Sequence, residues 1–309
     1  MSNCVFWYLR EAEAGRLLKR KRRPIKSSTL KADRNCITAH VVPLIGRLLV
    51  SGVVKSDIEK LMSDIASGKT AKPRNGRGGV TTGGRGVAVR VVTVLHSIFE
   101  HAIRMDLVGS NPARGIRKPA YQVKDRRLSE AEIIQIGRTM ANMAKEGESP
   151  TGILAIKFLL LTGFRRNEAL ALRSSWIGKN GGFIQFPDTK SGRQVRIIGQ
   201  AAASLIRSKF SRTDDCYVFP ADFGGGHFIG LPRVLGRVTL RAGISGITLH
   251  TLRHTFASMA AEMGFTELTI AGLLGHASRG VTQRYIHIDE ALVLAADKVS
   301  TRMRQLLDQ

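Results

Sequence analysis

The sequence predicts a mainly helical protein with a small antiparallel β-sheet, divided into two domains. Apolar residues recur at helical spacing through most of the 309 residues, and several segments begin with helix-capping residues. The period changes to two only after Trp176, where residues 183–186 and 194–198 flank a polar stretch. A basic stretch with little apolar content, residues 113–127, separates two helical regions and is typical of a linker.

The composition is typical of a chain that folds, and it excludes several classes of protein. Hydrophobic residues make up 43% of the chain, enough for real cores, and 9 Pro with 32 Gly are too few for a collagen-like or wholly disordered protein. Cys4, Cys36 and Cys216 are widely separated, so neither a disulfide framework nor a cysteine-rich zinc site is indicated. No long apolar run or signal peptide is recognisable, which predicts a cytoplasmic protein outside the membrane.

The charge is strongly positive and favours a polyanionic partner. The chain has 48 Lys and Arg against 24 Asp and Glu, a formal charge of +24. Such an excess opposes compaction unless a polyanion balances it, so nucleic acid is the leading candidate. Residues 1–122 carry a net +15 and residues 123–309 a net +9. The densest run, Lys19–Pro24, is either a solvated loop or a phosphate contact.

Four helices are expected in the first half, with no competing β pattern. A helical pattern runs from Ser28 to about Gly46 and is bent or ended by Pro43. A capping box beginning at Ser56 starts a helix that ends near Gly68. Residues 73–86 are rich in glycine and arginine and are expected to form a flexible basic loop. Residues 87–105 then form a long helix with one apolar face.

The second domain begins with a capping box at Ser129 and Glu132. Pro150 suits the first turn of an apolar helix that ends at Gly163. The alternating residues beyond it predict a β-hairpin whose polar turn spans residues 188–193. Helices return from Leu231 to the end of the chain, broken by glycines at 243, 246, 264, 275 and 280.

Two charged clusters in the second half suit phosphate chemistry. Arg165 and Glu168 lie in the turn between two apolar helices, where an ion pair covering a helix start is the simpler explanation. His250 and Arg253 are three residues apart and share a helix face. An arginine fork binds two phosphate oxygens, and an imidazole moves a proton near neutral pH. Of the two histidines, His254 rather than His250 is predicted to be the buried structural one.

Tyr285 is the tyrosine with the most suggestive surroundings. The other tyrosines, Tyr8, Tyr121 and Tyr217, lie outside the basic clusters, whereas Tyr285 follows Arg284 and lies nine residues after His276. A tyrosine oxygen can attack phosphorus if neighbouring groups hold the phosphate and accept the proton.

Taken together, the order Arg, Lys, His-x-x-Arg, His, Tyr resembles the tyrosine recombinases, the phage integrase family. The resemblance is strongest over residues 160–290, in the segments Thr-Gly-Phe-Arg, Leu-Arg-His-Thr-Phe-Ala-Ser, Leu-Leu-Gly-His and Gln-Arg-Tyr-Ile-His. The first half resembles that family's core-binding domain, with Gly-Gly-Arg-Gly-Val-Ala before a long helix and a closing Ser-Asn-Pro-Ala. The resemblance implies a helical, SAM-like core-binding domain over residues 1–118, a basic linker over 119–127, and a tyrosine-recombinase catalytic domain with a C-terminal tail over 128–309.

The resemblance also implies a role for each matching residue. Arg165 and Arg253 match the two arginines that clamp the scissile phosphate, and Glu168 matches the acidic residue that supports the first arginine. Lys190 matches the lysine that protonates the departing 5′ oxygen. His250 matches the general acid/base, and His276 matches the residue that donates a hydrogen bond to a non-bridging phosphate oxygen. Tyr285 matches the nucleophile.

A site-specific recombinase from a prophage or another mobile element is therefore expected, with no metal and no cofactor. Its partners would be double-stranded DNA attachment sites and further copies in a homotetramer, with an accessory DNA-bending protein as another candidate. The location implied is the nucleoid of a prokaryotic cell. The resemblance further implies that the terminal segment 290–307 packs on a neighbouring subunit, and packing on its own domain is the alternative. The predicted DNA contacts are Arg85, Arg90, Arg117, Lys118, Arg126 and Arg127.

Two positions depart from the family pattern, and three rival functions stay open. Thr251 stands where an acidic residue is common, and Arg166 where an apolar residue is usual. The segment 6–9 resembles the middle of the family's first core-binding helix, which fits a truncated relic, a misplaced start or a natural short form. The rivals are a type IB topoisomerase, a catalytically silent DNA-binding relic, and a general basic nucleic-acid protein.

Overall fold

The computed structural model describes residues 1–18, 24–72, 83–119, 125–178, 180–189, 192–207, 215–275 and 290–309. The chain divides into two compact units, Met1–Val123 and Lys124–Gln309. This division falls within the predicted linker, residues 119–127. The basic run 19–23, residues 73–82 of the predicted loop and Gly280 lie outside the described residues.

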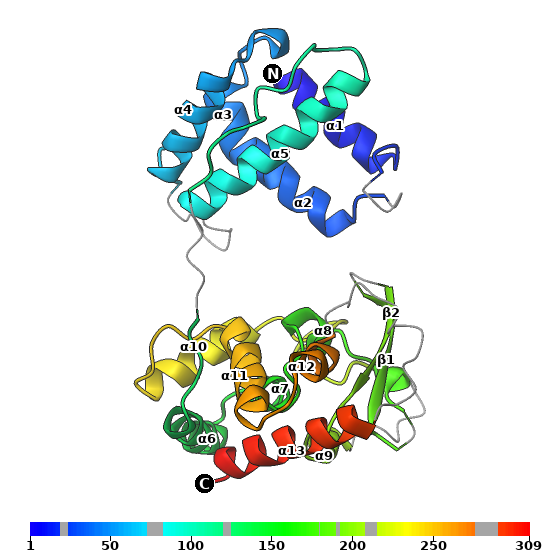
Figure 1. Ribbon diagram of the computed structural model, residues 1–309. Helices are drawn as coiled ribbons and strands as arrows, with labels where there is room; N and C mark the ends of the chain where they lie inside the picture. The colour runs from blue at the N-terminus through cyan, green and yellow to red at the C-terminus, as the bar shows by residue number, and fades with distance from the viewer. Residues whose placement is uncertain are drawn as a thin grey trace. The chain divides into compact units, whose positions relative to one another are not determined.

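The first unit is helical and is built around one long helix, α5 (Figure 1). By length and composition alone, α5 passes as a membrane-spanning helix, but half of its most apolar window is buried. Val91, Leu95, Ile98 and Phe99 of α5 are fully buried in the core of this unit. The long helix predicted over residues 87–105 is thus present. The elements of the unit are α1 (Ser2–Glu13), α2 (Ser27–Cys36), η1 (Ile37–Val41), α3 (Val42–Ile45), η2 (Val50–Gly52), α4 (Lys55–Ala66) and α5 (Arg85–Arg104).

Two details of this unit differ from the sequence prediction. The helix expected over residues 28–46 contains a π-helical turn, η1, immediately before α3. Pro43 has no backbone N–H to donate within an α-helix, which accounts for the irregular turn at this point. The start of α4 was expected at Ser56, but the helix begins at Lys55 with Val54 as N-cap. The Asp57 carboxylate accepts a hydrogen bond from the Val54 N–H at 3.0 Å, which moves the start toward the N-terminus.

The second unit surrounds the apolar helix α7 with other helices. The predicted capping box is confirmed, because Ser129 Oγ accepts from the Glu132 N–H at 3.2 Å and the Glu132 carboxylate accepts from the Ser129 N–H at 2.9 Å. Pro150 occupies the first turn of α7, as predicted. Helix α7 packs against neighbours that include α10, α11 and α13. The helices are α6 (Glu130–Lys145), α7 (Pro150–Thr162), α8 (Arg166–Leu170), η3 (Ser174–Trp176), α9 (Gln200–Leu205), α10 (Leu231–Arg241), α11 (Leu249–Glu262), α12 (Glu267–Leu274) and α13 (Glu290–Leu307).

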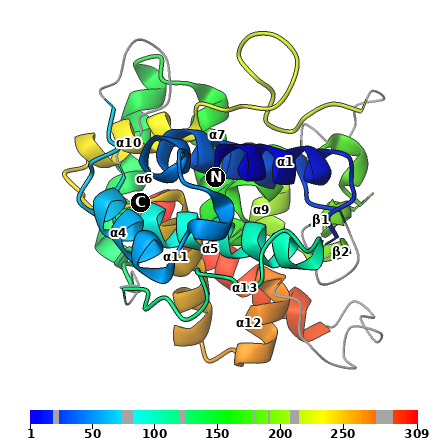
Figure 2. The same cartoon turned by 90° about the horizontal axis from the view of Figure 1, so that it is seen from above.

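The predicted β-hairpin is also present. Strands β1 (Phe183–Thr189) and β2 (Gly192–Ile197) pair antiparallel, with Phe183 opposite Ile197 and Thr189 opposite Gly192. The pair lies at one edge of the second unit, and α10 lies at the opposite edge (Figures 1 and 2). The fold is therefore mainly helical with a two-stranded antiparallel sheet, as the sequence predicts.

The terminal helix packs on its own unit. Helix α13 packs against α6, α7 and α9 of that unit. Val299 and Met303 are fully buried, and Leu306 is almost completely so. The apolar face of α13 completes the core of the second unit, so its removal would expose that core to water.

We expect Met303→Ala to lower the free energy of unfolding of the second unit by about 2–5 kcal/mol, because it leaves a cavity in a fully buried position. Leu294→Ala on the same helix, where the side chain is 51% exposed, is the matched control and should change it by less than about 0.5 kcal/mol. Trp7 and Trp176 are the two tryptophans and lie in different units. Urea unfolding followed by Trp176 fluorescence in a Trp7→Phe background therefore reports on the second unit alone. A midpoint that rises with protein concentration would contradict packing within the same chain.

Candidate active site

A sharp turn after α7 presents Arg165. Gly163 ends the helix in the left-handed conformation, with φ +62°. A Cβ at this position would lie 2.6 Å from a ring carbon of Phe256, so both the backbone and the space require glycine. Phe164 is buried and packs on Phe158 with ring centroids 5.6 Å apart. Arg165 follows as the N-cap of α8, with its side chain 46% exposed.

Glu168 holds Arg165 through both of its carboxylate oxygens. Arg165 Nη1 donates to Oε1 at 2.8 Å, and the Arg165 backbone N–H donates to Oε2 at 3.2 Å. The side chain of Glu168 is only 14% exposed, whereas the guanidinium of Arg165 reaches the surface. The carboxylate thus binds both the backbone and Nη1 of Arg165, while the exposed part of the guanidinium stays accessible to an anion.

Helix α11 begins with a threonine capping box. Thr248 Oγ1 accepts from the Thr251 N–H at 3.2 Å, and Thr251 Oγ1 accepts from the Thr248 N–H at 3.1 Å. An acidic residue at this third position would make the same reciprocal contact. Thr251, which departs from the family pattern, therefore caps the helix in place of a carboxylate.

Arg253 is the buried centre of the site. It is 4% exposed, and its Nη1 donates to the Gly163 carbonyl at 2.8 Å. Its Nη2 donates to the Leu274 carbonyl at 3.0 Å. Burial, followed by the nearby charge of Arg165, lowers the pKa of Arg253 to about 10, so the group stays cationic at neutral pH. Arg253 therefore joins the Arg165 turn to the end of α12.

His250 lies at the exposed start of α11, within the electrostatic reach of both arginines. Partial burial lowers its pKa from 6.5, and the charges of His254, Arg253 and Arg165 lower it further. The His250 and His254 rings meet edge to face with centroids 4.5 Å apart. The prediction that His254 is a buried structural histidine is wrong, because its side chain is exposed. One turn after His250, it lies on the same solvent-facing side of the helix.

Arg196 of β2 is a member of this cluster that the sequence did not indicate. It is 2% exposed, and its Nη2 donates to Glu168 Oε2 at 3.1 Å. The same carboxylate therefore contacts Arg165 and Arg196. The adjacent Val195 is 41% exposed, so the strand turns its arginine inward and its valine outward. Strand alternation with polar residues outside would predict the opposite, which is why Arg196 was missed.

Three members of the predicted set lie outside the described residues. They are Lys190, His276 and Tyr285. The structure therefore brings together Arg165, Glu168, His250 and Arg253 and leaves the other three assignments as predictions.

The described residues hold no group of three or more His, Cys, Asp or Glu side chains that could bind a metal ion. The three cysteines are free thiols. The polar chemistry of the described site is thus that of guanidinium, carboxylate and imidazole groups.

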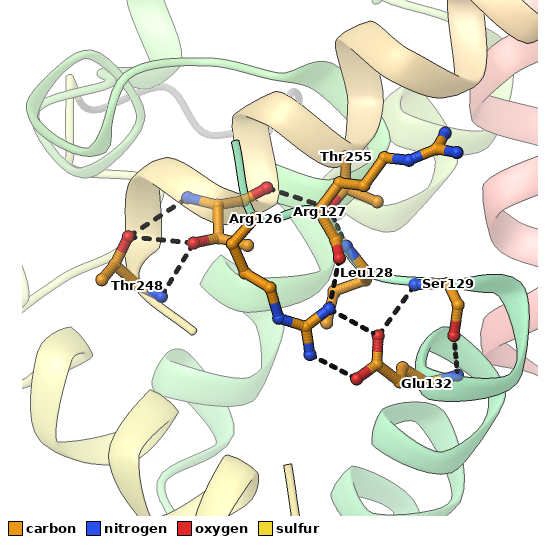
Figure 3. Close-up of polar contacts among 8 residues, drawn as sticks. Arg126, Arg127, Leu128, Ser129, Glu132, Thr248 and Thr255 are labelled. Atoms are coloured by element: carbon orange, nitrogen blue, oxygen red, sulfur yellow. Dashed lines mark hydrogen bonds and ion pairs between the residues drawn. The ribbon is translucent and has the colours of Figure 1, made fainter. Parts of the chain in front are cut away.

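Arg126 and Arg127, two of the predicted DNA contacts, form ion pairs at the start of the second unit. Figure 3 shows the contact of Arg126 with Glu132. Arg126 makes a two-point contact with Glu132 and donates to the Arg127 carbonyl. The hydrogen bond from Arg126 lowers the pKa of Glu132 to about 2. Arg127 pairs with Glu262, and both of these side chains are more than half exposed. Of the two, Arg127 is the arginine that could exchange its carboxylate for a phosphate.

The other predicted DNA contacts lie in the first unit. Arg90 of α5 forms an ion pair with Asp33, whose side chain is only 9% exposed. Lys118 Nζ donates to Thr93 Oγ1 at 3.3 Å. Their role in DNA binding stays a prediction. The two remaining predicted contacts are Arg85 and Arg117, and neither forms an ion pair among the described residues.

A hydrogen-bonded connection joins the start of the second unit to α11 (Figure 3). The Leu128 N–H donates to Thr255 Oγ1 at 2.9 Å, and that hydroxyl donates to the Thr251 carbonyl at 2.9 Å. Thr255 is 2% exposed. The end of the linker is therefore attached to the first turns of the helix that carries His250 and Arg253.

The comparisons with known proteins concern the sequence and the fold of this chain. The model of the phage integrase family matches residues 126–291. Tyrosine recombinase XerD of Oceanobacillus iheyensis is 26% identical over 214 residues, which cover 65% of this chain and 71% of the relative. Tyrosine recombinase XerA of Saccharolobus solfataricus is 28% identical over 173 residues, 56% of this chain and 57% of the relative. A lambda integrase dimer bound to a COC′ core site shares the fold, with a TM-score of 0.67 and 18% identity over 89% of this chain and 94% of that chain.

We expect His250 to titrate below 6.5 in the protein without DNA, and His254→Gln to raise the midpoint because it removes the neighbouring positive charge. Side-chain NMR of the histidines as a function of pH measures both. His227→Gln, which removes a histidine that contacts Tyr217, is the control and should leave the His250 midpoint unchanged. A His250 midpoint at or above 6.5 would contradict the described environment.

Thr255→Val should lower the free energy of unfolding of the second unit by about 1–3 kcal/mol, because the buried Leu128 N–H loses its acceptor. Thr239→Val is the matched control, since the Thr239 hydroxyl donates only to carbonyls of its own helix among the described residues. Hydrogen exchange of the Leu128 amide should accelerate only in Thr255→Val. Equal exchange in both variants would rule out the connection.

Proposed function

Because the chain belongs to the phage integrase family, we propose that it is a site-specific DNA recombinase that acts through a 3′-phosphotyrosyl intermediate. The observation that carries this proposal is the convergence of Arg165, Glu168, His250 and Arg253. Arg253 donates to the carbonyl of Gly163, 90 residues away in the sequence. This convergence of two guanidinium groups, one accessible and one buried, supports their proposed role as the phosphate clamp.

The proposed cleavage exchanges one phosphoester for another. The Tyr285 oxygen attacks the scissile phosphorus, a new P–O bond forms, and the bond to the 5′ oxygen breaks. His250 accepts the phenolic proton, and Lys190 donates a proton to the departing oxygen. Arg165 and Arg253 stabilise the charge that develops on the non-bridging oxygens, and His276 donates a hydrogen bond to one of them.

The environment of His250 suits the first of these proton transfers. Burial and the neighbouring positive charges lower its pKa, so the imidazole is mainly neutral at pH 7 and can accept a proton. As the pH falls through that lowered pKa, the base becomes protonated and cleavage should slow. Positioned proton transfer of this kind contributes about 10²–10⁴-fold to a rate.

Rejoining would use the same groups in reverse. The phosphotyrosyl bond conserves the energy of the phosphodiester, so strand joining needs no nucleotide, and the reaction should proceed in EDTA. In the proposed assembly four copies exchange strands through a Holliday junction. A lambda integrase tetramer bound to a Holliday junction has the same fold, with a TM-score of 0.66, which supports this arrangement.

DNA binding would draw on the basic residues of both units. Arg85 and Arg117 of the first unit and Arg127 of the second are the strongest candidates, because they are unpaired among the described residues or only weakly paired at the surface. Contacts of this kind release counterions, so binding should weaken steeply as salt concentration rises.

We expect Tyr285→Phe to abolish covalent attachment to DNA and to leave DNA affinity nearly unchanged, because it removes only the nucleophilic oxygen. The purified chain is mixed in EDTA with nicked duplexes taken from DNA flanking its own gene. SDS-resistant protein–DNA adducts are then measured for the wild type and the variant side by side.

An adduct that persists in Tyr285→Phe would contradict the assignment of the nucleophile. Salt-sensitive binding with no adduct from the wild type would favour the catalytically silent DNA-binding protein. Relaxation of plasmids without any sequence preference would favour the type IB topoisomerase.

A further inference from the structure

Arg196 is almost completely buried, although it has no role in the proposed chemistry. Its side chain is 1% exposed, and arginine is among the residues least often buried. Replacing a buried ion pair by apolar side chains is often neutral or stabilising. Stability alone therefore does not explain an arginine at this strand position.

The contacts of Arg196 reach two segments of the proposed site. Nη2 donates to Glu168 Oε2 at 3.1 Å, and Nη1 donates to the Leu273 carbonyl at 2.8 Å. Its guanidinium carbon lies 5.4 Å from the centre of the Phe164 ring. Because Glu168 also binds Arg165, the three side chains form a continuous sequence of charges from Arg196 through Glu168 to Arg165.

The guanidinium of Arg196 lies directly against Gly275. That glycine has φ +61°, and a Cβ built on it would lie 1.9 Å from the guanidinium carbon. Only glycine admits this contact, and the next residue in the chain is His276. Arg196 therefore contacts the turn that presents Arg165 and the segment that leads to His276, from the strand that follows Lys190.

The third guanidinium nitrogen of Arg196, Nε, is buried and has no hydrogen-bond partner among the described residues. A buried donor without a partner costs about 1–3 kcal/mol. The hydrogen bonds of Nη1 to the Leu273 carbonyl and of Nη2 to Glu168 therefore keep the side chain in place.

We infer that Arg196 is a positioning residue for Arg165, which it orients toward the scissile phosphate through Glu168. Its bond to the Leu273 carbonyl keeps the guanidinium in place beside Glu168. The inference rests on the proposed recombinase function. It predicts that loss of Arg196 slows DNA cleavage without weakening DNA binding.

The test compares Arg196→Met and Arg196→Lys with Ile197→Ala, a buried apolar residue on the same strand that contacts neither Arg165 nor Glu168 by hydrogen bonds. Single-turnover cleavage at saturating nicked duplex, DNA affinity and melting temperature are measured for each. Arg196→Met should slow cleavage by about tenfold to hundredfold, as misplacement of a reacting group does. Arg196→Lys should recover part of the rate, because an ammonium can reach Glu168 or the Leu273 carbonyl.

A neutral substrate separates positioning from general destabilisation. Once the adduct locates the scissile site, a methylphosphonate is placed there, which removes the negative charge that Arg165 neutralises. Arg196→Met should cleave this duplex as fast as the wild type does. A defect that persists on the neutral duplex, or one that Ile197→Ala shares, would overturn the inference.

A second readout does not depend on cleavage. In the wild type, Glu168 restrains the Arg165 guanidinium, so its Nη resonances should be separate in ¹⁵N NMR. They should merge in Arg196→Met and stay separate in Ile197→Ala. If the wild type forms no adduct, the proposed function fails, whereas a normal adduct with unchanged Arg165 resonances in Arg196→Met defeats only the positioning role.

Discussion

The site depends on the contact of one buried guanidinium with two backbone carbonyls. Arg253 donates to Gly163 at 2.8 Å and to Leu274 at 3.0 Å, at the ends of two different helices. The last carbonyls of a helix have no hydrogen-bond partner within the helix. A cation placed there donates hydrogen bonds to these carbonyls and is attracted to the negative end of the helix dipole. A single side chain of α11 thus fixes both the turn that carries Arg165 and the end of α12.

Much of this arrangement could be predicted from local sequence. The Ser129 capping box, Pro150 in the first turn of α7 and the β-hairpin depend on neighbouring residues, and all three are present. The resemblance, not the spacing alone, identified Arg165 and Arg253 as one site, and their convergence is visible only in the fold. His254 and Arg196 were misjudged or missed because burial on a helix face or strand face depends on what packs there.

The excess of positive charge indicated a polyanionic partner but could not say which cations would meet it. Arg90 and Arg126 are engaged with Asp33 and Glu132, where they stabilise the individual units. Glu132 also caps α6, so Arg126 supports a helix start as well as the linker. Lys and Arg side chains in a basic protein therefore serve two purposes, and only the fold separates them.

The balance of charge within the site would favour the binding of an anion. Burial lowers the pKa of Arg253 most, the charges of Arg165 and Arg196 lower it further, and Glu168 raises it, with a net pKa of about 10. Burial and Arg165 likewise lower the pKa of Arg196 to about 10. Lowered pKa values mean that the folded site destabilises its own cations relative to water. A phosphodiester carries one negative charge, so its arrival would offset part of this cost. The same charges that weaken the empty site would then bind the scissile phosphate, and most tightly when further charge develops on its oxygens during the reaction.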